Sequence, residues 1–458
     1  MKKIENESEE YTLKLKKITT VSADKAWKTE VTEAEFVKDS AGVENELVNV
    51  YPEVEYQKIS GFGGAFTEAS AYTLQQMSEQ VYDSIIDDYF GKNGLNYSFC
   101  RSHIDSCDFS LGNYSAVTDP NDTELKTFSL ARDEKYILPM IRKAQEASSS
   151  KISLLLSPWS PPAFMKTNGQ KNGGGKLKPE YRGLWAKYIS RYVSEFKRLG
   201  FDIAAISVQN EPKAVQTWDS CIFTASEEGE FVSEYLGPQL KADGLGDIDI
   251  IIWDHNKERA YDRARDTLSV GKCKELVAGV AFHWYSGDHF ESLEILRKMY
   301  PDKKLIFTEG CVEYSRFGAA DQLKNAQMYA HDILGNLNGG MNVYIDWNLV
   351  LNEKGGPNHV GNFCDAPIMC DTGNNTYEKK LSYTYIGHFS KYILPGAVRV
   401  GHTKYIDKLE VTAFRNTDGT FAMVVLNRTN ESIPFTVRIN EQLCKLMAEA
   451  DSISTLIF

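Results

Sequence analysis

Residues 204–212 read Ala-Ala-Ile-Ser-Val-Gln-Asn-Glu-Pro. The small and apolar residues that begin this stretch are typical of a strand buried on both faces, as in a parallel sheet. Pro212 cannot donate to a sheet ladder, so the strand is predicted to end there, with Asn210 and Glu211 at its rim. A carboxylate in this place is either an ordinary loop acid or a functional group. A second strand that ends in the same way would favour function.

A second apolar run ends in a carboxylate about two strand–helix units further along the chain. Residues 304–310 read Lys-Leu-Ile-Phe-Thr-Glu-Gly, which places Glu309 at the end of the run. In a repeating (β/α) barrel, Glu211 and Glu309 would lie at the same end of parallel strands and could flank one bond. Glycoside hydrolysis needs that arrangement, because one acid protonates the leaving oxygen and the other attacks or stabilises the sugar cation.

Strand-like runs recur along the chain, and helical segments separate most of them. They predict an α/β protein with a (β/α)8 TIM barrel, whose strands lie at 59–68, 96–101, 151–157, 204–212, 248–253, 277–282, 304–310 and 341–348. A helix is expected at about 69–90, after the first strand. A doubly wound open sheet is the structural alternative, but it would concentrate polar residues at one switch point. Polar residues instead follow nearly every run, which favours the barrel.

Both ends of the chain alternate polar and apolar residues with period two. This alternation is typical of antiparallel strands with one buried face, and turn residues such as 416–419 separate the runs. We therefore expect three segments along the chain. The N-terminal strands (1–56) and the C-terminal strands (396–458) together form a β-sandwich, which is attached to the catalytic barrel (57–395).

The composition excludes several classes of protein. The chain of 458 residues carries a net charge of −12, which argues against nucleic acid or an anionic membrane as a main partner. No window approaches the roughly 18 to 20 apolar residues of a membrane span. The N-terminus has no apolar stretch that would act as a signal peptide, so a cytoplasmic location is expected, with secretion open if a leader was removed. The oligomeric state is left open.

The cysteines and histidines give no strong metal signal. None of the 8 cysteines forms a Cys-x-x-Cys pair or has a histidine at zinc-finger spacing, so reduced thiols are expected. The run Asp254-His255-Asn256 at the end of the fifth strand invites a metal or acid–base interpretation. Hydrogen bonding in a cleft also explains this run, and glycosidic cleavage needs no metal, so neither a metal nor a cofactor is predicted.

Short motifs follow one another across residues 57 to about 371. They are Gly-Phe-Gly-Gly-Ala-Phe-Thr-Glu (61–68), Cys-Asp-Phe-Ser (107–110), Ser-Pro-Trp-Ser-Pro-Pro (157–162), Met-Lys-Thr-Asn-Gly (165–169), Gln-Asn-Glu-Pro (209–212), His-Trp-Tyr (283–285), Thr-Glu-Gly (308–310), Asp-Trp-Asn-Leu (346–349) and Gly-Gly-Pro-Asn (355–358). In this order they resemble glycoside hydrolase family 30 of clan A, the family of the glucosylceramidases. Asn-Glu-Pro alone is shared across the clan, whereas the ordered set is specific.

The resemblance implies a retaining β-glycosidase and a role for each matching residue. Glu211 matches the family's acid/base, Glu309 its nucleophile, and Asn210 the residue that bonds the sugar 2-hydroxyl. The further substrate-binding candidates are Arg101 and Tyr285 beside the nucleophile, Asp108, Trp347 and Asn362 at the terminal sugar, and Trp159 and Phe164 in the loop after the third strand. Trp159 is equally well interpreted as a packing residue beneath the site.

Two residues depart from the family pattern. Phe164 stands where the pattern has a tryptophan that stacks and donates a hydrogen bond, and His359 stands where a tryptophan follows Gly-Gly-Pro-Asn. The expected substrates are β-D-glucosides or β-1,6-glucan oligosaccharides. The alternatives are a β-xylosidase or β-fucosidase of the same family, and a carbohydrate-binding protein without catalysis.

Retention of configuration sets the expected geometry of the two acids. Their carboxyl groups should lie about 5 to 5.5 Å apart, so that Glu309 attacks the anomeric carbon directly. Glu309 is expected to stay ionised because Arg101 should lower its pKa, whereas Glu211 should be protonated at rest with a raised pKa. Glu313 is the rival nucleophile, but it falls beyond the end of the strand.

Overall fold

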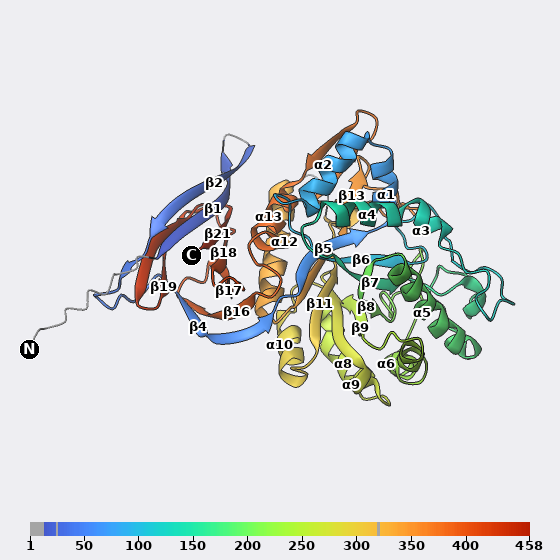
Figure 1. The fold of residues 1–458 in the computed structure, drawn as a ribbon. Coiled ribbons are helices and arrows are strands. Elements are labelled where there is room, and N and C mark those ends of the chain that lie inside the picture. Colours follow the sequence, from blue (N-terminus) through green and yellow to red (C-terminus); the bar gives the residue numbers. More distant parts are fainter. Residues whose placement is uncertain (1–12, 24–25, 318–320) are drawn as a thin grey trace, which may run out of the picture. The chain divides into compact units, whose positions relative to one another are not determined.

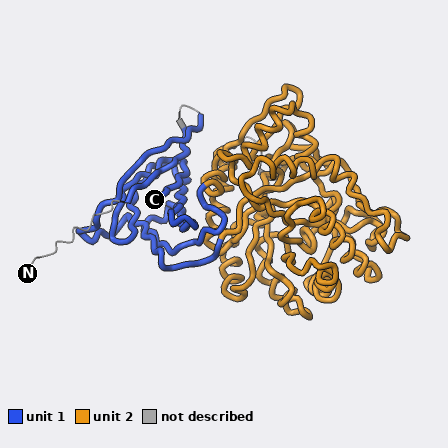
Figure 2. The backbone as a smooth tube through the Cα atoms, in the orientation of Figure 1, with its two compact units in different colours: residues 1–58, 392–458 blue, residues 59–391 orange. Residues whose placement is uncertain are grey.

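The computed structural model describes residues 13–23, 26–317 and 321–458. The chain forms two compact units, one of Met1–Lys58 with Tyr392–Phe458 and one of Ile59–Lys391 (Figure 2). The boundaries expected from the sequence fall after residues 56 and 395, close to these. The unit of Ile59–Lys391 holds the barrel and the candidate site.

The barrel is closed, and its parallel strands follow the order β10-β11-β12-β5-β6-β7-β8-β9 (Figure 1). The strands are β5 (Gly61–Phe66), β6 (Phe99–Ile104), β7 (Ser153–Pro158), β8 (Asp202–Ser207), β9 (Asp249–Asn256), β10 (Val277–His283), β11 (Lys304–Glu309) and β12 (Val343–Asn348). The last strand pairs with the first, with Val343 opposite Gly61. This closure confirms the predicted (β/α)8 barrel, because an open doubly wound sheet would leave two edges.

Small and branched side chains fill the barrel. Residues from each of β6 to β12 meet in one buried cluster, which contains Phe99, Leu155, Ala205, Ile251, Ala281, Ile306, Val343 and Ile345. Fully burying one large aliphatic side chain stabilises a fold by about 1.5–3 kcal/mol. The glycines of β5 are required by close packing, because a Cβ atom on Gly63 would lie 1.8 Å from the carbonyl oxygen of Phe99 on β6.

Helices follow most strands and cover the outside of the barrel (Figure 1). They are α1 (Glu68–Gln75), α2 (Glu79–Phe90), α3 (Ala131–Lys135), α4 (Ile137–Ala147), α5 (Arg182–Arg198), α6 (Ala225–Phe231), the π-helix η3 (Val232–Leu236), α7 (Gly237–Ala242), α8 (Ala260–Leu268), α9 (Cys273–Leu276), α10 (Phe290–Met299), α11 (Tyr314–Phe317), α12 (Gln322–Asn338) and α13 (Leu381–Ser390), with 3-10 turns η1 (Ala163–Met165), η2 (Pro179–Tyr181) and η4 (Lys257–Arg259). The single helix expected at 69–90 is wrong. Two helices lie there, because the Ser78 side chain accepts from the Val81 amide and caps α2.

The second unit is built from strands of both chain ends. Its sheet follows the order β2-β1-β21-β18-β17-β16-β4-β19-β20-β3. The strands are β1 (Lys14–Ala23), β2 (Ala26–Glu35), β3 (Val37–Lys38), β4 (Leu47–Lys58), β16 (Val398–Lys404), β17 (Leu409–Arg415), β18 (Phe421–Asn427), β19 (Ile433–Ile439), β20 (Gln442–Ala448) and β21 (Ser452–Ile457). Because β1 pairs with β21, and β4 with β16 and β19, the N-terminal strands complete the C-terminal domain as predicted.

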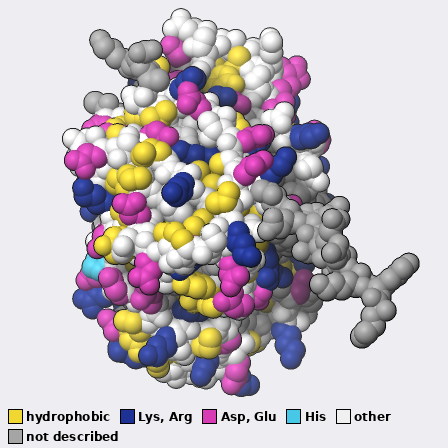
Figure 3. Space-filling model, turned by 90° about the vertical axis from the view of Figure 1, so that its left-hand side faces the viewer, with side chains coloured by type: hydrophobic (Ala, Val, Ile, Leu, Met, Phe, Trp, Pro, Cys, Tyr) yellow, Lys and Arg dark blue, Asp and Glu magenta, His cyan; other side chains and the backbone are white. Residues whose placement is uncertain are grey.

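Two smaller features complete the description. A three-stranded sheet of β13 (Val350–Asn352), β14 (Ile368–Asp371) and β15 (Thr376–Lys379) follows the last barrel strand. The face drawn in Figure 3 carries acidic and basic side chains interspersed with hydrophobic ones. Such mixing of charges is ordinary for a solvated surface.

Candidate active site

A cavity of about 300 Å³ lies at the carboxyl ends of the barrel strands. Most of the predicted site residues line it, namely Asp108, Trp159, Asn210, Glu211, Tyr285, Glu309, Trp347 and Asn362. Side chains that end different parallel strands meet here because the strands of a (β/α)8 barrel all open at one mouth. The two predicted catalytic acids, Glu211 and Glu309, therefore share one cavity.

The backbone turns sharply where Glu211 follows β8. Glu211 has a φ angle of 46° and Asp254 one of 51°, left-handed values that residues other than glycine seldom adopt. The amide of Glu211 donates to the Asp254 carbonyl at 2.9 Å, and the amide of Asn210 donates to the carbonyl at the end of β7 at 2.8 Å. These bonds tie the loop to the neighbouring strands. Sparsely populated backbone angles of this kind cluster at functional sites.

Glu309 ends β11, and two donors orient its carboxylate. Arg101 Nη1 donates to Oε2 at 2.8 Å, and the Tyr285 hydroxyl donates to Oε1 at 3.0 Å. Burial raises the pKa of Glu309, while the charges of His283 and Arg101 oppose the rise. A lowered pKa was expected from the arginine, so the direction is reversed, because the sequence does not show how completely the carboxylate loses its water. An oriented and desolvated carboxylate can attack an electrophilic carbon in the cavity.

Arg101 on β6 is fully buried and joins several parts of the site. Its Nη2 donates to Asn210 Oδ1 and to Asp254 Oδ2, each at 2.8 Å, in addition to the Nη1 bond to Glu309. The guanidinium carbon lies 4.6 Å from the centre of the Trp159 ring. A buried cation is stable only when its charge is compensated, and Arg101 meets that condition with two carboxylates. Arg101 thus contacts the nucleophile candidate from behind the cavity wall.

Two imidazoles face the same oxygen of Glu211. His255 Nδ1 lies 3.3 Å and His283 Nδ1 lies 3.4 Å from Glu211 Oε1. Burial by itself raises the pKa of Glu211, but the two histidines outweigh it and hold this pKa below its usual range. Burial likewise opposes protonation of His283, yet the charge of Glu309 and the hydrogen bonds to Asp254 and Glu211 raise its pKa to about 9. A raised pKa was expected for Glu211, and the reversal follows from histidines that the sequence could not place.

The wall of the cavity combines stacked indoles with an acceptor. Trp159 and Trp347 stack with their ring centres 5.2 Å apart and an angle of 22° between the rings. Asp108 is almost fully buried, and burial raises its pKa, to which the charge of Glu309 adds. Its Oδ2 accepts a hydrogen bond from Asn358 Nδ2 at 3.3 Å. Aromatic faces beside a buried acceptor suit the apolar face and the hydroxyl groups of a sugar.

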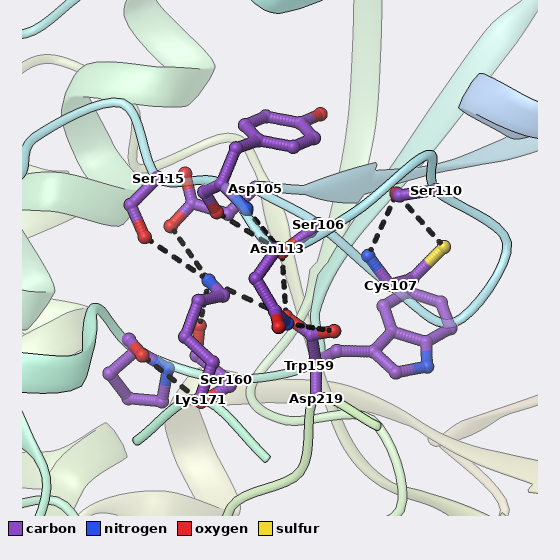
Figure 4. A network of polar contacts seen from close by, with 12 residues as sticks. Asp105, Ser106, Cys107, Ser110, Asn113, Ser115, Trp159, Ser160, Lys171 and Asp219 are labelled. Atoms are coloured by element: carbon purple, nitrogen blue, oxygen red, sulfur yellow. Dashed lines mark hydrogen bonds and ion pairs between the residues drawn. The ribbon is translucent and has the colours of Figure 1, made fainter. Parts of the chain in front are cut away.

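A buried polar network fixes the loop that carries Asp108 (Figure 4). Lys171 Nζ lies 3.4 Å from Asp105 Oδ2 and 3.7 Å from Asp219 Oδ1. The Ser106 hydroxyl donates to Asp219 Oδ1 at 2.6 Å. These contacts tie Asp105 and Ser106, which precede Asp108 in the loop, to Lys171 and Asp219. The backbone that carries Asp108 is therefore held in place.

Phe164 is not brought to this cavity. It lies in η1 and lines a second cavity of about 560 Å³. Its ring packs edge-on against Tyr181, with 5.6 Å between the ring centres. Among the described residues, Phe164, where the sequence departs from the family pattern, therefore lines a different cavity from the one that Glu211 and Glu309 share.

Several residues that line the cavity were missed by the sequence reasoning. Gln216 Nε2 donates to Glu211 Oε2 at 3.5 Å, and Trp218 and Arg316 also reach the cavity. Glu313, the rival nucleophile, lines it too and accepts from Asn362 Nδ2 at 3.5 Å. The only signal was their position, because these residues lie in the segments that follow β8 and β11, and barrel enzymes build their sites after the strands.

The closed parallel barrel and the paired glutamates at its mouth define the class of a glycoside hydrolase. Comparison with known proteins gives the family. The "Glycosyl hydrolase family 30 TIM-barrel domain" matches residues 59–393, and the "Glycosyl hydrolase family 30 beta sandwich domain" matches residues 396–456. The chain belongs to glycosyl hydrolase family 30.

Relatives of known sequence or structure agree with this assignment. The chain is 34% identical to the lysosomal acid glucosylceramidase of Mus musculus over 410 residues, which cover 85% of this chain and 79% of the relative. The crystal structure of SrfJ from Salmonella typhimurium has a TM-score of 0.92 and 39% identity, covering 97% of this chain and 99% of that one. The endo-β1,6-glucanase BT3312 has a TM-score of 0.85 and 28% identity, with the same coverage of 97% and 99%.

The protein is therefore a β-glycosidase, and its substrate is a β-linked glycoside. No helix within residues 13–23, 26–317 and 321–458 is both long and apolar enough to cross a membrane.

Proposed function

We propose that the protein hydrolyses β-D-glucosidic bonds with retention of configuration, with Glu309 as nucleophile and Glu211 as acid/base. The observation that carries this proposal is the fixed orientation of the Glu309 carboxylate, which Arg101 and Tyr285 hold in the cavity that Glu211 also lines. When both oxygens of a carboxylate are held in place, the group is already oriented for attack on the anomeric carbon. A freely rotating carboxylate would have to be oriented first, which adds to the barrier.

The reaction takes two displacements. In the first, a Glu309 oxygen bonds to the anomeric carbon, the bond from that carbon to the leaving oxygen breaks, and Glu211 passes the proton that it shares with His283 to the leaving oxygen. In the second, Glu211 takes a proton from water, the water oxygen bonds to the anomeric carbon, and the bond to Glu309 breaks. Each acid returns to its starting state, and two inversions give retention.

His283 is placed to serve the proton transfer. Its Nδ1 lies 3.4 Å from Glu211 Oε1, and its Nε2 lies 3.0 Å from Asp254 Oδ1. Asp254 fixes the ring, since it also accepts from Ser207 and Thr308 at 2.5 and 2.6 Å. The proton that His283 and Glu211 share can therefore pass through Glu211 to the leaving oxygen.

The remaining contacts orient one sugar residue. Asn210, whose Oδ1 is held by Arg101, presents its amide nitrogen to the 2-hydroxyl group. Asp108, Asn362 and the indole of Trp347, which all line the cavity, bind the other hydroxyls and the ring. A cavity of about 300 Å³ is at the lower end of small-molecule sites and suits a single terminal glucosyl unit.

The choice of a glucoside is supported by the relatives, which include a glucosylceramidase and an endo-β1,6-glucanase. The case for a xyloside or a fucoside rested on Phe164, which lines a different cavity. A panel of aryl β-glucoside, β-xyloside, β-fucoside and β-galactoside tests the choice. The β-glucoside should have the highest kcat/KM, and a higher value for any other sugar would contradict the proposal.

Glu309→Gln tests the nucleophile, with Glu313→Gln as a matched control from the same cavity. Removing the nucleophile should lower kcat by several orders of magnitude, on the scale of about 10⁴-fold or more seen when a covalent catalyst is deleted. The control should lose far less, because Glu313 lies beyond the reach of Arg101 and Tyr285 in the contacts described. Equal losses would remove Glu309 from its role, and wild-type protein that binds sugars without turnover would make the protein a carbohydrate-binding protein.

Glu211→Gln tests the acid/base. The variant should still cleave glucosides with a very acidic phenol as the leaving group, because such a phenolate needs no proton. It should lose the hydrolysis of alkyl glucosides. A uniform loss for both classes of substrate would show that Glu211 does not supply the proton.

A further inference from the structure

Three side chains that commonly bind transition metals converge beside the cavity. Glu211, His255 and His283 each offer one donor atom, and these atoms all lie within 4.8 Å of one another. The two imidazole nitrogens are 3.3 and 3.4 Å from Glu211 Oε1. The residues come from the loop after β8 and the ends of β9 and β10, so the barrel itself holds them together.

The two nitrogen–oxygen separations match the edges of a tetrahedral zinc site, and all three donor atoms lie within 4.8 Å of one another. Zinc bonds of about 2.0–2.2 Å to nitrogen and oxygen place neighbouring donor atoms about 3.3–3.6 Å apart. Two imidazoles with one carboxylate are also a ligand set that zinc enzymes use, with water in the fourth position.

Both imidazoles turn Nδ1 toward Glu211, so a bound ion would replace the proton that His283 Nδ1 shares with Glu211 Oε1 at 3.4 Å. His283 Nε2 lies 3.0 Å from Asp254 Oδ1, which directs Nδ1 toward Glu211, as the carboxylate–histidine–metal arrangement requires. His255 Nδ1 is a buried atom that faces Glu211 but meets no hydrogen-bond geometry with any described residue. A buried polar atom without a hydrogen bond calls for an explanation, and a bound ion is one explanation that fits a nitrogen aimed at a carboxylate.

We propose that Glu211, His255 and His283 form an inhibitory binding site for Zn²⁺ and similar divalent transition metals. The ion enters through the substrate cavity, because Glu211 and His255 both line it. Once bound, it occupies the carboxylate oxygen that faces the histidines and prevents Glu211 from exchanging a proton. The inhibition rests on the proposed acid/base role of Glu211, whereas the binding of the metal does not.

Co²⁺ titration of the full-length protein tests the site without reference to turnover. Tetrahedral Co²⁺ gives intense visible absorption bands, and Zn²⁺ should displace it and remove them. His255→Gln should weaken Co²⁺ binding by at least about tenfold, the scale on which metal sites respond to lost partners. The matched control is His331→Gln on α12, which removes an imidazole that contacts Asp288 at 3.1 Å away from the cavity, and it should bind Co²⁺ as the unmodified protein does.

The inhibition is measured on an aryl β-glucoside, with each variant compared with its own rate in EDTA. Zn²⁺ should inhibit the unmodified protein and the His331→Gln variant at the same concentration, and inhibit His255→Gln at a concentration at least about tenfold higher. EDTA should restore the rate. Circular dichroism verifies the fold of each variant, and Glu211→Gln provides a second ligand deletion for the Co²⁺ titration if His255→Gln does not fold.

Each outcome decides the proposal. Absence of Co²⁺ bands together with full activity in millimolar Zn²⁺ would overturn it. Equal inhibition of His255→Gln and unmodified protein would also overturn it, and would point to the cavity thiols Cys311 and Cys364 instead. Displaceable Co²⁺ bands that His255→Gln weakens, with hydrolysis unaffected by Zn²⁺, would support the site and contradict the acid/base role of Glu211.

Discussion

The hydroxyl group of Tyr285 can be removed with little change in volume by the substitution Tyr285→Phe. In the unmodified protein this hydroxyl donates to Glu309 Oε1 at 3.0 Å, and burial raises the pKa of Tyr285 well above its usual value, so the group remains a donor. Arg101 still holds the other carboxylate oxygen in the variant. The substitution therefore removes one of the two donors that favour the ionised form of Glu309.

The size of the effect follows from the charge on the acceptor. A hydrogen bond to a charged group contributes about 1.5–3 kcal/mol, and one pKa unit corresponds to about 1.36 kcal/mol. The pKa of Glu309, already raised by burial, should rise by about one to two further units. Since the anion attacks, the acidic limb of kcat/KM against pH should move to higher pH by that amount. Activity on the acidic limb should fall about 10- to 100-fold, while the plateau changes much less.

Hydrolysis of an aryl β-glucoside across the pH range measures this shift, because kcat/KM reports ionisations of the free enzyme. The matched control is Tyr377→Phe on β15. It deletes a hydroxyl that donates to Asp88 Oδ2 at 2.7 Å. The control should keep the acidic limb in place. An equal loss for Tyr285→Phe at every pH, with the limb unmoved, would refute the argument, because Tyr285 would then act on the geometry of the site and not on the ionisation of Glu309.

Three further outcomes are expected. Arg101→Met should lower the free energy of unfolding in urea by about 3–5 kcal/mol, because it leaves two buried carboxylates without their cation. Burial raises the pKa of Asp133 to about 8, so the folded state binds this proton more tightly than the unfolded state does, and stability should fall as pH rises from about 4 to about 8. Asp133→Asn should flatten that dependence in thermal melts. Gly63→Ala should destabilise or abolish the fold, since its Cβ would lie 1.8 Å from the Phe99 carbonyl oxygen, whereas Gly112→Ala, which meets nothing within 4 Å, should melt like the unmodified protein.

The sequence predicted the barrel and the meeting of its two glutamates for a simple geometric reason. Apolar runs locate the strands in the sequence, and a polar residue that directly follows a run lies at the carboxyl end of that strand. In a closed parallel barrel, all of these ends meet at one mouth, so Glu211 and Glu309 had to share it. The N-terminal strands were equally predictable, because their period-two pattern required a partner sheet.

The loops were less predictable, because the periodic pattern of hydrophobic residues locates helices and strands but gives no information about the backbone angles of the loops between them. Glu211 follows β8 with a φ angle of 46°, and Trp253 and Asp254 have φ angles of 73° and 51° just before His255. These left-handed turns bring His255 to face Glu211, which no spacing rule contains. Phe164 was misplaced for the same reason. It was expected at the substrate site, but the short helix η1 places it in another cavity. The electrostatics of the two acids depend on these turns, so their pKa directions were the least accessible property.

Arg101 explains why the fold and the site cannot be separated. Its guanidinium on β6 bonds Glu309 on β11, Asp254 on β9 and Asn210 after β8, so four elements contribute to one set of hydrogen bonds. None of these residues is near Arg101 in sequence, and the bonds form only when the barrel closes. Because the charges are buried together, a barrel that closed in the wrong register would leave a buried charge without its partner, which is strongly destabilising. Correct closure and a correctly oriented nucleophile are consequently the same event in this protein.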